Sequence, residues 1–326
     1  MRSLTVAVER FPIAGKFVIA RGAKTEAVVV TATIKDNGVR GRGECTPYAR
    51  YDETVESVTS QIESIRTDIE AGADRMRLQT LLAPGAARNA LDCALWDLEA
   101  KRRGLRAHEL VGAAPPAPVV TAFTLSVGSP AEMAAAAAAA RERPLLKVKL
   151  AGEGDVVRLR AVRAAAPDAA LIVDANESWP AADLQANLAA CAAAGVILVE
   201  QPLPAGADAA LGQIERIVPI CADESAHDRH GLEMLRERYD VINVKLDKAG
   251  GLTEALAMAE EAENLGFAIF AGCMVASSLA MAPALLIAAR ARFVDLDGPL
   301  LLARDRPEGL VYDGSMILPA SPALWG

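Results

Sequence analysis

The feature that most constrains the fold is a repeat of short apolar segments, each of which ends close to a charged residue. LLKVKL, LIVDA, VILVE, VPICA and VINVKL follow one another in this way. Their charges are Lys149, Asp174, Glu200, Asp223 and Lys245, at successive separations of 25, 26, 23 and 22 residues. One strand, one helix and two short connections occupy about this length. The repeat therefore predicts parallel strands that alternate with helices.

Eight such strands are expected, since VVTAFTL precedes the five above and AIFA and RFVDL follow them. Eight units predict an α/β fold, a (β/α)8-type TIM barrel in which one helix is irregular. Residues 1 to about 60 instead show alternating strands around a DNG hairpin turn, and residues 87–104 show helical periodicity that stops at Gly104. The turn-rich stretch GAAPPAP, residues 112–118, is the expected boundary between these parts.

Composition excludes several classes of function. The net charge is −8, the pI is about 5.1, and no basic cluster with interleaved aromatics occurs, so nucleic-acid and membrane binding are not expected. The five cysteines are scattered without a CxxC pair, which argues against a disulfide framework or a zinc cluster. The N-terminus lacks the apolar region of a signal peptide, and no apolar run is long enough to span a bilayer. A soluble cytoplasmic protein is therefore expected.

Three of the strand-end charges are carboxylates on neighbouring strands. Asp174, Glu200 and Asp223 would converge at the C-terminal ends of the strands, where barrel chemistry collects, and would repel one another without a cation. An all-oxygen set suits Mg²⁺ or Mn²⁺. The alternative is that each acid separately caps a helix or pairs with an arginine, but three acids at the same position in consecutive units favour the metal site.

Two lysines lie at the ends of strands that are four apart in an eight-stranded ring. Lys149 and Lys245 would therefore face each other across the barrel, one on each face of a bound substrate. Lys147 is two residues before Lys149, so both side chains point to the same side, and its like charge would lower the pKa of Lys149 toward that of a usable base. A solvated edge strand is the alternative, against which the aliphatic neighbours argue. Two opposed bases predict 1,1-proton transfer at the carbon α to a carboxylate, through an enolate.

KVK, VDAN, VEQP, ADES and NVKLDKAGG, in this order, resemble motifs of the enolase superfamily, muconate-lactonising subgroup, and NALDCALWDL resembles that subgroup's linker-proximal helix. The resemblance covers nearly the whole chain. It implies a modified (β/α)7β TIM barrel at residues 117–298, an α+β capping domain at 1–116, and a segment at 299–326 that returns to the capping domain. It also implies Lys149 and Lys245 as acid/base catalysts, and one Mg²⁺ per subunit, replaceable by Mn²⁺, held by Asp174, Glu200 and Asp223.

Within the subgroup, the stretch VDLDGP resembles dipeptide epimerases, in which an acidic pair binds the free α-ammonium of the substrate. By this resemblance Asp295 and Asp297 would be that pair, and the alternative is a strand end capped by its own backbone. FVIARG, GECTPYARY and LDKAGGLTEAL resemble epimerases specific for L-Ala-D/L-Glu, in which a capping-domain cation holds the glutamate side chain. Lys24 corresponds to that cation, with Arg21 as the other candidate, and they lie in the first of two expected substrate loops, 21–26. Tyr51 lies in the second, 43–53.

The expected partner is therefore a small dipeptide, in a murein-peptide recycling context that only the resemblance implies. Other reactions of the same scaffold stay open, namely N-acylamino acid racemisation, o-succinylbenzoate synthesis and cycloisomerisation. A non-catalytic binding protein is a further alternative, but five retained charges at strand ends argue against it because unused buried charges cost stability. A homo-oligomer is expected, and the sequence does not give the number of subunits.

Overall fold

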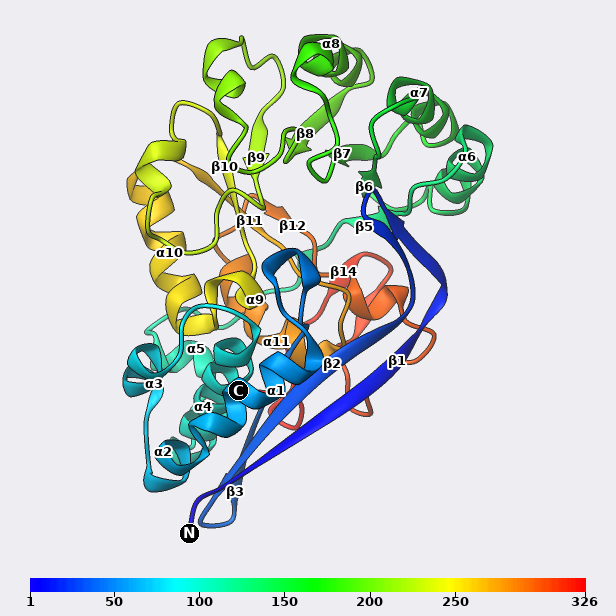
Figure 1. Ribbon diagram of the computed structural model, residues 1–326. Coiled ribbons are helices and arrows are strands. Elements are labelled where there is room, and N and C mark those ends of the chain that lie inside the picture. Colours follow the sequence, from blue (N-terminus) through cyan, green and yellow to red (C-terminus); the bar gives the residue numbers. More distant parts are fainter.

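The computed structural model describes all residues, 1–326, and its N-terminal part begins with a three-stranded antiparallel sheet. The strands are β1 (Ser3–Ile19), β2 (Gly22–Asp36) and β3 (Val39–Cys45), in the order β1-β2-β3. Asn37 and Gly38 join β2 to β3 with φ of 50° and 85°, so the predicted DNG hairpin is confirmed. The long β1–β2 hairpin carries its tip from the capping domain up to the barrel (Figure 1).

Five helices follow this sheet: α1 (Val55–Ser64), α2 (Arg66–Ala71), α3 (Arg75–Leu81), α4 (Ala86–Arg103) and α5 (Ala107–Leu110). The expected helix at 87–104 is α4, and Gly104 ends it in the left-handed region at φ 64°. Gly41 and Gly43 on β3 let α4 lie directly on the sheet, because a Cβ at either position would fall 2.2 Å or less from a carbonyl oxygen of α4.

The eight expected barrel strands are present as one parallel sheet whose order follows the chain. A hydrogen bond from Ala122 N to Val294 O, 2.8 Å long, joins its first and last strand segments. The first strand is shorter than predicted, because VVTAFTL divides between β4, which joins another sheet, and β5. The strands are β5 (Phe123–Leu125), β6 (Leu145–Lys149), β7 (Ala170–Asp174), β8 (Val196–Glu200), β9 (Ile220–Ala222), β10 (Val241–Val244), β11 (Ala268–Ala271) and β12 (Phe293–Val294).

The connections between these strands depart from the prediction of a single irregular helix. Two of them, β8–β9 and β9–β10, contain only short 3-10 turns, η3 (Ala209–Gln213) and η4 (Leu232–Leu235). The first is interrupted by prolines and glycines, for example Pro202 and Gly206, which oppose helix formation. The remaining connections carry η2 (Ala181–Asp183), α6 (Pro130–Ala139), α7 (Asp155–Ala165), α8 (Leu184–Ala193), α9 (Leu246–Ala249), α10 (Leu252–Asn264) and α11 (Ser278–Ala288).

The C-terminal segment contacts both parts of the molecule. It comprises η5 (Gly298–Leu301), β13 (Tyr312–Asp313) and β14 (Met316–Ile317), and β14 pairs with β4 (Val119–Val120). Trp325 donates its indole N–H to the carbonyl of Cys93 on α4, 3.0 Å away. Arg306 bonds to Glu9 and Glu44 of the capping sheet, with the Nη2–Oε2 distance being 2.6 Å in both cases. The segment therefore fastens the capping domain to the barrel, while the boundaries at 116/117 and 298/299 stay predictions.

An apolar layer fills the barrel interior below the charged residues. Three of its members, Ile172, Leu198 and Cys221, lie two residues before Asp174, Glu200 and Asp223, and because side chains alternate along a strand each charge stands directly above an apolar neighbour. The other members are Val241, Phe270 and Phe293. A separate core lies between the capping sheet and α1–α4. None of the helices is long and apolar enough to traverse a membrane.

Candidate active site

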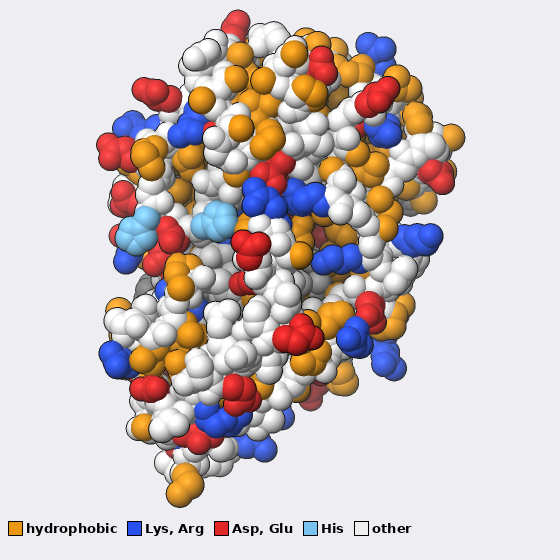
Figure 2. Space-filling view, viewed as in Figure 1, with side chains coloured by type: hydrophobic (Ala, Val, Ile, Leu, Met, Phe, Trp, Pro, Cys, Tyr) orange, Lys and Arg blue, Asp and Glu red, His pale blue; other side chains and the backbone are white.

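A cavity of about 390 Å³ lies between the C-terminal ends of the barrel strands and the capping domain. We call its two sides the charged floor and the capping roof. The charged floor consists of Lys149, Asp223 and Lys245, which line the cavity, together with Lys147, Asp174 and Glu200, which are buried and do not line it. The capping roof consists of Arg21, Lys24, Tyr48 and Arg50, all of which line the cavity. Figure 2 shows basic side chains gathered at the centre of the visible face, between the barrel and the capping helices.

Lys147 and Lys149 point to the same side of β6, as strand alternation requires, but their surroundings differ. Lys147 is 1% exposed, and its Nζ lies 2.7 Å from Glu200 Oε2, 2.7 Å from Asp295 Oδ2 and 3.4 Å from Asp174 Oδ2. Burial lowers the pKa of Lys147, but these carboxylates outweigh burial and raise it well above its usual value. Three carboxylates therefore balance the charge of Lys147. The sequence instead predicts that its positive charge lowers the pKa of Lys149.

Lys149 and Lys245 enter the cavity from opposite sides of the barrel. They end or follow β6 and β10, which are four strands apart in the eight-stranded sheet, and both line the cavity. Lys149 Nζ donates to Asp174 Oδ2 over 2.5 Å, and Lys245 Nζ donates to Asp223 Oδ2 over 2.6 Å. Burial lowers the pKa of Lys245, but Asp223 and Glu200 raise it well above its ordinary value. The floor thus brings together the two lysines that the sequence singled out.

The three carboxylates of the floor are almost fully buried, at 0–1% exposure. Burial and the Asp174 charge raise the pKa of Glu200 to about 7. For Asp174, burial also raises the pKa, but Lys149 and Lys147 outweigh it and bring it to about 2. Burial likewise opposes the effect of Lys245 and Lys248 on Asp223, whose pKa lies well below its usual range. Packing three carboxylates in a buried site is costly unless cations compensate for it.

The donor set fits a hard divalent cation, although no three acidic, histidine or cysteine side chains form a ready metal cage in this structure. Lysine ammonium groups lie among the carboxylates instead, as described above. Glu200 Oε2 is buried and is paired with Lys147 Nζ, 2.7 Å away, while Oε1 accepts a hydrogen bond from Asn243 Nδ2 over 2.7 Å. Three buried carboxylates whose present partners are mostly lysine ammonium groups form the all-oxygen set that Mg²⁺ or Mn²⁺ prefers.

Asp295 and Asp297 both line the cavity beyond the last barrel strand, β12. Asp297 Oδ2 accepts a hydrogen bond from Thr124 N over 2.6 Å. Asp295 Oδ2 pairs with Lys147, whereas its Oδ1 is buried and has no hydrogen-bond partner. Burial and the Asp295 charge raise the pKa of Asp297 to about 7. A buried oxygen without a donor, beside a second carboxylate, can accept a cationic group from a ligand.

The roof distinguishes the two basic candidates, Arg21 and Lys24. Arg21 is already paired, with its Nη2 2.7 Å from Glu224 Oε1 and 3.0 Å from the Tyr48 hydroxyl, and its Nη1 3.2 Å from Glu177 Oε2. Lys24 lies over the Tyr48 ring, 5.3 Å from its centroid, and makes no ion pair or hydrogen bond. Burial lowers the pKa of Lys24. Lys24 is therefore the roof cation that is available to a ligand anion.

Two roof predictions change in the structure. Residues 21–26 are not a loop, because β2 begins at Gly22 and Lys24 pairs with Phe17 in the β1–β2 ladder. The sequence 43–53 does contain a loop, with η1 (Ala49–Tyr51), but Tyr51 does not line the cavity. Its ring packs edge-on against Tyr48 and His227, with centroids 5.5 and 4.6 Å apart. At this loop the lining aromatic is Tyr48, and Tyr51 supports it from behind.

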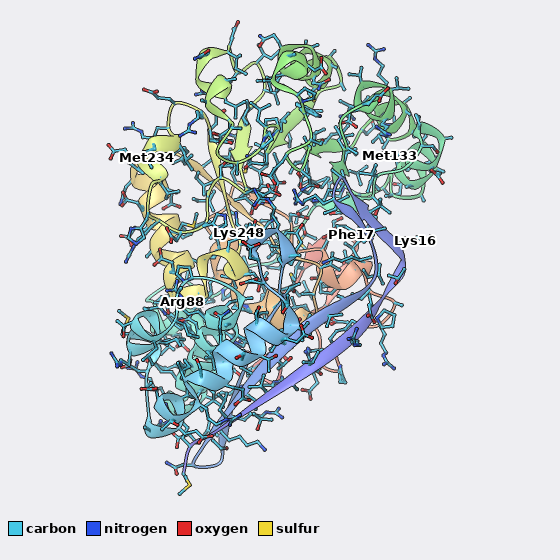
Figure 3. The ribbon with its side chains drawn as sticks, in the orientation of Figure 1. Lys16, Phe17, Arg88, Met133, Met234 and Lys248 are labelled. Carbon is cyan, nitrogen blue, oxygen red and sulfur yellow. The ribbon has the colours of Figure 1, made fainter.

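Sequence reasoning missed several residues that complete the site. Glu224 follows Asp223 directly in ADES, lines the cavity and has a buried, unpartnered Oε2. Lys248, near the centre of Figure 3, donates to Asp223 Oδ1 over 2.7 Å and to the Asn243 carbonyl over 3.0 Å. The adjacency of Glu224 to a strand-end acid was the one available signal, whereas Lys248, on α9, reaches the site through its contact with Asp223.

Gln201, next to Glu200, was also missed, and it links two strands of the floor. Its side-chain carbonyl accepts hydrogen bonds from Asp223 N (2.9 Å) and Ser225 N (3.1 Å). Its amide group donates to Leu203 O, Ser225 Oγ and Tyr239 Oη. Gln201 is fully buried and has a positive φ of 36°, a conformation that costs energy in a non-glycine residue. It fixes the backbone of Asp223 relative to Glu200.

Family models match most of the chain. The mandelate racemase / muconate lactonizing enzyme N-terminal domain matches residues 1–112, and the enolase C-terminal domain-like family matches residues 131–319. The chain belongs to the enolase superfamily. Both the predicted superfamily and the predicted barrel-plus-capping fold are thereby confirmed, and the assignment makes the chain a relative of racemases and epimerases that act on amino acid derivatives.

Relatives of known activity cover nearly the whole chain. L-Ala-D/L-Glu epimerase of Escherichia coli (strain K12) is 49% identical over 96% of this chain and 98% of its own. N-acetyl-D-glutamate racemase of a Pseudoalteromonas species is 45% identical over 91% of this chain and 95% of its own. These two similar proteins act on substrates that differ in whether the amino group is free.

Solved structures show the same fold with ligands. A crystal structure of an enolase family member from Agrobacterium tumefaciens with homology to dipeptide epimerases, with bound sodium and L-Ala-L-Glu, is 56% identical and covers 100% of both chains at a TM-score of 0.99. A dipeptide epimerase from Enterococcus faecalis V583, complexed with Mg and L-Leu-L-Tyr, is 27% identical over 97% of this chain and 96% of its own, at a TM-score of 0.90.

Proposed function

We propose that this chain is a Mg²⁺-dependent dipeptide epimerase that inverts the Cα of the C-terminal residue, with L-Ala-D/L-Glu as its substrate. The observation that carries the proposal is that Lys149 and Lys245 reach one cavity from opposite sides, beside three buried carboxylates. The whole-length similarity to an L-Ala-D/L-Glu epimerase supports the same substrate. Opposed bases around a carbon acid are what a 1,1-proton transfer requires.

Lys149 and Lys245 would divide the proton transfer between the two faces of the substrate. One Nζ accepts the proton from Cα, and the other returns a proton to the opposite face, which inverts the configuration. The raised pKa of Lys245 keeps it protonated beside Asp223 and therefore suited to be the donor in one direction. For the other stereoisomer the two roles are exchanged, as microscopic reversibility demands.

Asp174, Glu200 and Asp223 would hold the Mg²⁺, with Mn²⁺ as a substitute. When bound, the cation supplies positive charge that stabilises the negative charge developing on the substrate carboxylate as Cα loses its proton. Gln201 keeps Glu200 and Asp223 in fixed relation, and Lys248 holds Asp223 Oδ1. The lysine contacts of the carboxylates must rearrange for these oxygens to serve as ligands.

Recognition of the two ends of the dipeptide would fall to opposite parts of the cavity. Asp295 and Asp297 receive the α-ammonium of the N-terminal residue, because Asp295 Oδ1 is buried without a donor. Lys24 receives the side-chain carboxylate of glutamate, because it is the roof cation without a partner. Arg21, already paired with Glu224, supports the roof instead of binding the substrate anion.

The second candidate function is racemisation of an N-acylated amino acid. The similarity to an N-acetyl-D-glutamate racemase favours it, and an acyl group provides no cation for Asp295 and Asp297. The two functions share the floor and the glutamate-binding cation, so only the amino end of the substrate separates them.

The deciding experiment is proton NMR of the purified protein with Mg²⁺ in D₂O, with L-Ala-L-Glu and N-acetyl-L-Glu as parallel substrates. Loss of the glutamate Cα proton signal together with growth of the L-Ala-D-Glu diastereomer supports the proposal. Exchange of N-acetyl-L-Glu alone would replace it with the racemase function. Treatment with EDTA should abolish the exchange, and added Mg²⁺ should restore it; exchange that survives EDTA would contradict the metal assignment.

A further inference from the structure

Glu177 lies on the barrel rim three residues after Asp174, in the connection between β7 and α8. It is not a cavity-lining residue, and the proposed chemistry does not use it. Asn176 and Glu177 both have positive φ, 46° and 67°, which is costly for consecutive non-glycine residues. The backbone of this turn is therefore in an unfavourable conformation, and we attribute the compensating stabilisation to the contacts of the Glu177 carboxylate.

Four donors from three segments converge on the Glu177 carboxylate. Arg50 binds it in a bidentate way, with Nε and Nη2 each 2.8 Å from an oxygen, and Arg21 Nη1 lies 3.2 Å from Oε2. Ala205 N, from the β8–β9 connection, donates to Oε1 over 2.8 Å. The side chain is 10% exposed. Burial raises the pKa of Glu177, but the hydrogen bond from Arg50 and the other donors outweigh it and lower the pKa.

Arg21 and Arg50 belong to the capping roof but come from different parts of the sequence. Arg21 is in the turn of the β1–β2 hairpin, three residues before Lys24, and Arg50 is in η1, two residues after Tyr48. Arg21 has a second carboxylate partner in Glu224, whereas Arg50 is hydrogen-bonded to Glu177 alone. Glu177 is thus the one carboxylate that both halves of the roof share, although Arg21 also reaches the barrel through Glu224 and the Asn176 carbonyl.

We propose that Glu177 is a positioning residue that fastens the two roof segments over the cavity and so sets the place of Lys24 and Tyr48. Its kinetic consequence rests on the proposed function, but the fastening itself does not. The body of the capping domain is held elsewhere, for example by Arg88, whose guanidinium donates to the carbonyls of Ala249 and Gly250 over 2.7 and 3.0 Å (Figure 3). Loss of the Glu177 charge should therefore loosen both roof segments, even though Arg21 keeps its bond to Glu224, and should leave the domains joined.

Limited proteolysis with trypsin tests the fastening without any substrate. The bonds after Arg21, Lys24 and Arg50 are tryptic sites within the roof, and none is followed by proline. Glu177→Gln keeps the side-chain volume and an acceptor for Ala205 N, but removes the charge that the two arginines share. Cleavage at these three bonds should become about tenfold faster, because local opening controls proteolysis of a folded protein.

The matched control is Glu263→Gln, which removes the partner of Arg290 in an ion pair whose two side chains are each 37% exposed. It should leave the roof cleavage rate unchanged. Arg50→Gln serves as a second variant on the exposed side of the same contact, in case Glu177→Gln does not fold. Because it removes the tryptic site after residue 50, its cleavage is followed at the bonds after Arg21 and Lys24. Roof cleavage at the wild-type rate in a folded Glu177→Gln or Arg50→Gln protein would overturn the proposal.

Steady-state kinetics with L-Ala-L-Glu then separate positioning from chemistry. We expect Glu177→Gln to raise KM about tenfold and to change kcat less than about threefold, because the floor lysines are untouched. The double variant with Arg50→Gln should be no worse than Glu177→Gln alone, since both remove one interaction. Fully additive losses, or a loss confined to kcat, would contradict the positioning role. Faster roof cleavage in a protein that epimerises nothing would support the fastening and refute the proposed function.

Discussion

The charged floor and the capping roof differ in how many partners each charged side chain has. In the floor, Lys147 alone contacts three carboxylates, and Asp223 contacts two lysines, so each charge has several partners inside a rigid barrel. In the roof, Lys24 has no anionic partner, and Arg50 depends on one carboxylate that lies 127 residues away in the sequence. Several ion pairs therefore hold each floor side chain in place, whereas few side-chain contacts hold the roof.

This difference assigns different tasks to the two regions. A reaction that moves protons needs groups held to within a fraction of an ångström, which rigid strands provide. Substrate entry and side-chain selection need segments that can open, and those are found where few contacts hold a chain. Variants in the floor should therefore remove the chemistry, and variants in the roof should change which substrate is used.

The largest expected effect comes from the two floor lysines. Lys149→Ala and Lys245→Ala should each lower the epimerisation rate by at least about 10³-fold, because each removes the only base on one face of Cα. Each variant keeps a base on one face only, so in D₂O it should exchange the Cα proton of one stereoisomer at most, and not of both. Proton NMR of both L-Ala-L-Glu and L-Ala-D-Glu measures this. Near wild-type epimerisation by either variant would break the two-base scheme.

The next effect should be selective for the substrate side chain. Lys24→Ala should lower kcat/KM for L-Ala-L-Glu by about 100-fold, the cost of losing one charge-assisted contact in a partly buried site. L-Ala-L-Leu, which has no side-chain carboxylate, should be affected by less than about threefold. Lys24→Arg is the matched variant and should retain the preference for glutamate. Equal losses for both dipeptides would place Lys24 outside the specificity pocket.

These two predictions also show how far the sequence reaches. Five of the six floor residues follow from strand-end charges at a regular spacing, and Lys147 follows from its alternation with Lys149 along one strand. Strand alternation and barrel geometry relate these sequence positions to positions in space. The roof was only partly predictable. Lys24 was singled out, but as part of a loop and not of β2, and the loop aromatic in contact with the cavity is Tyr48, whereas Tyr51 was expected.

The residues that were missed share a physical reason. Glu177, Lys248 and Gln201 act through contacts between segments that are brought together only by the fold, and their local sequences carry no periodic signal. The β8–β9 connection illustrates the same point, because it contains no α-helix and its first residue, Gln201, bonds to Tyr239 in the next connection. Tertiary packing, and not local propensity, decides such positions.

A third prediction tests how the floor keeps its rigidity. Gln201→Ala should weaken Mg²⁺ binding by about tenfold or more, since groups that orient metal ligands typically contribute 10- to 100-fold to affinity. The reason is that Asp223 N and Ser225 N lose their shared acceptor, which frees Asp223 relative to Glu200. Calorimetric titration with Mg²⁺ measures the effect without any substrate. Unchanged affinity in a folded variant would show that the strands alone fix the ligands.

The smallest expected effect concerns pH and separates the two ends of the dipeptide. Burial and Asp295 raise the pKa of Asp297 to about 7, so Asp297 gains a proton as the pH falls through this value and loses its attraction for an ammonium group. Lys147, paired with Asp295, is the nearby cation and stays charged because its pKa is raised. KM for L-Ala-L-Glu should therefore rise by about tenfold between pH 8 and pH 6.

Two comparisons isolate this titration from the rest of the floor. The inhibition constant of N-acetyl-L-Glu should change much less over the same range, because this ligand has no ammonium group for Asp297 to bind. Glu177, whose pKa is lowered, stays charged throughout, so trypsin cleavage of the roof should not depend on pH once the pH dependence of trypsin itself is subtracted. Parallel pH profiles for the dipeptide and N-acetyl-L-Glu would show that the titrating group is not Asp297. Divergent profiles would tie the acidic pair to the amino end of the substrate and leave the roof to select its side chain.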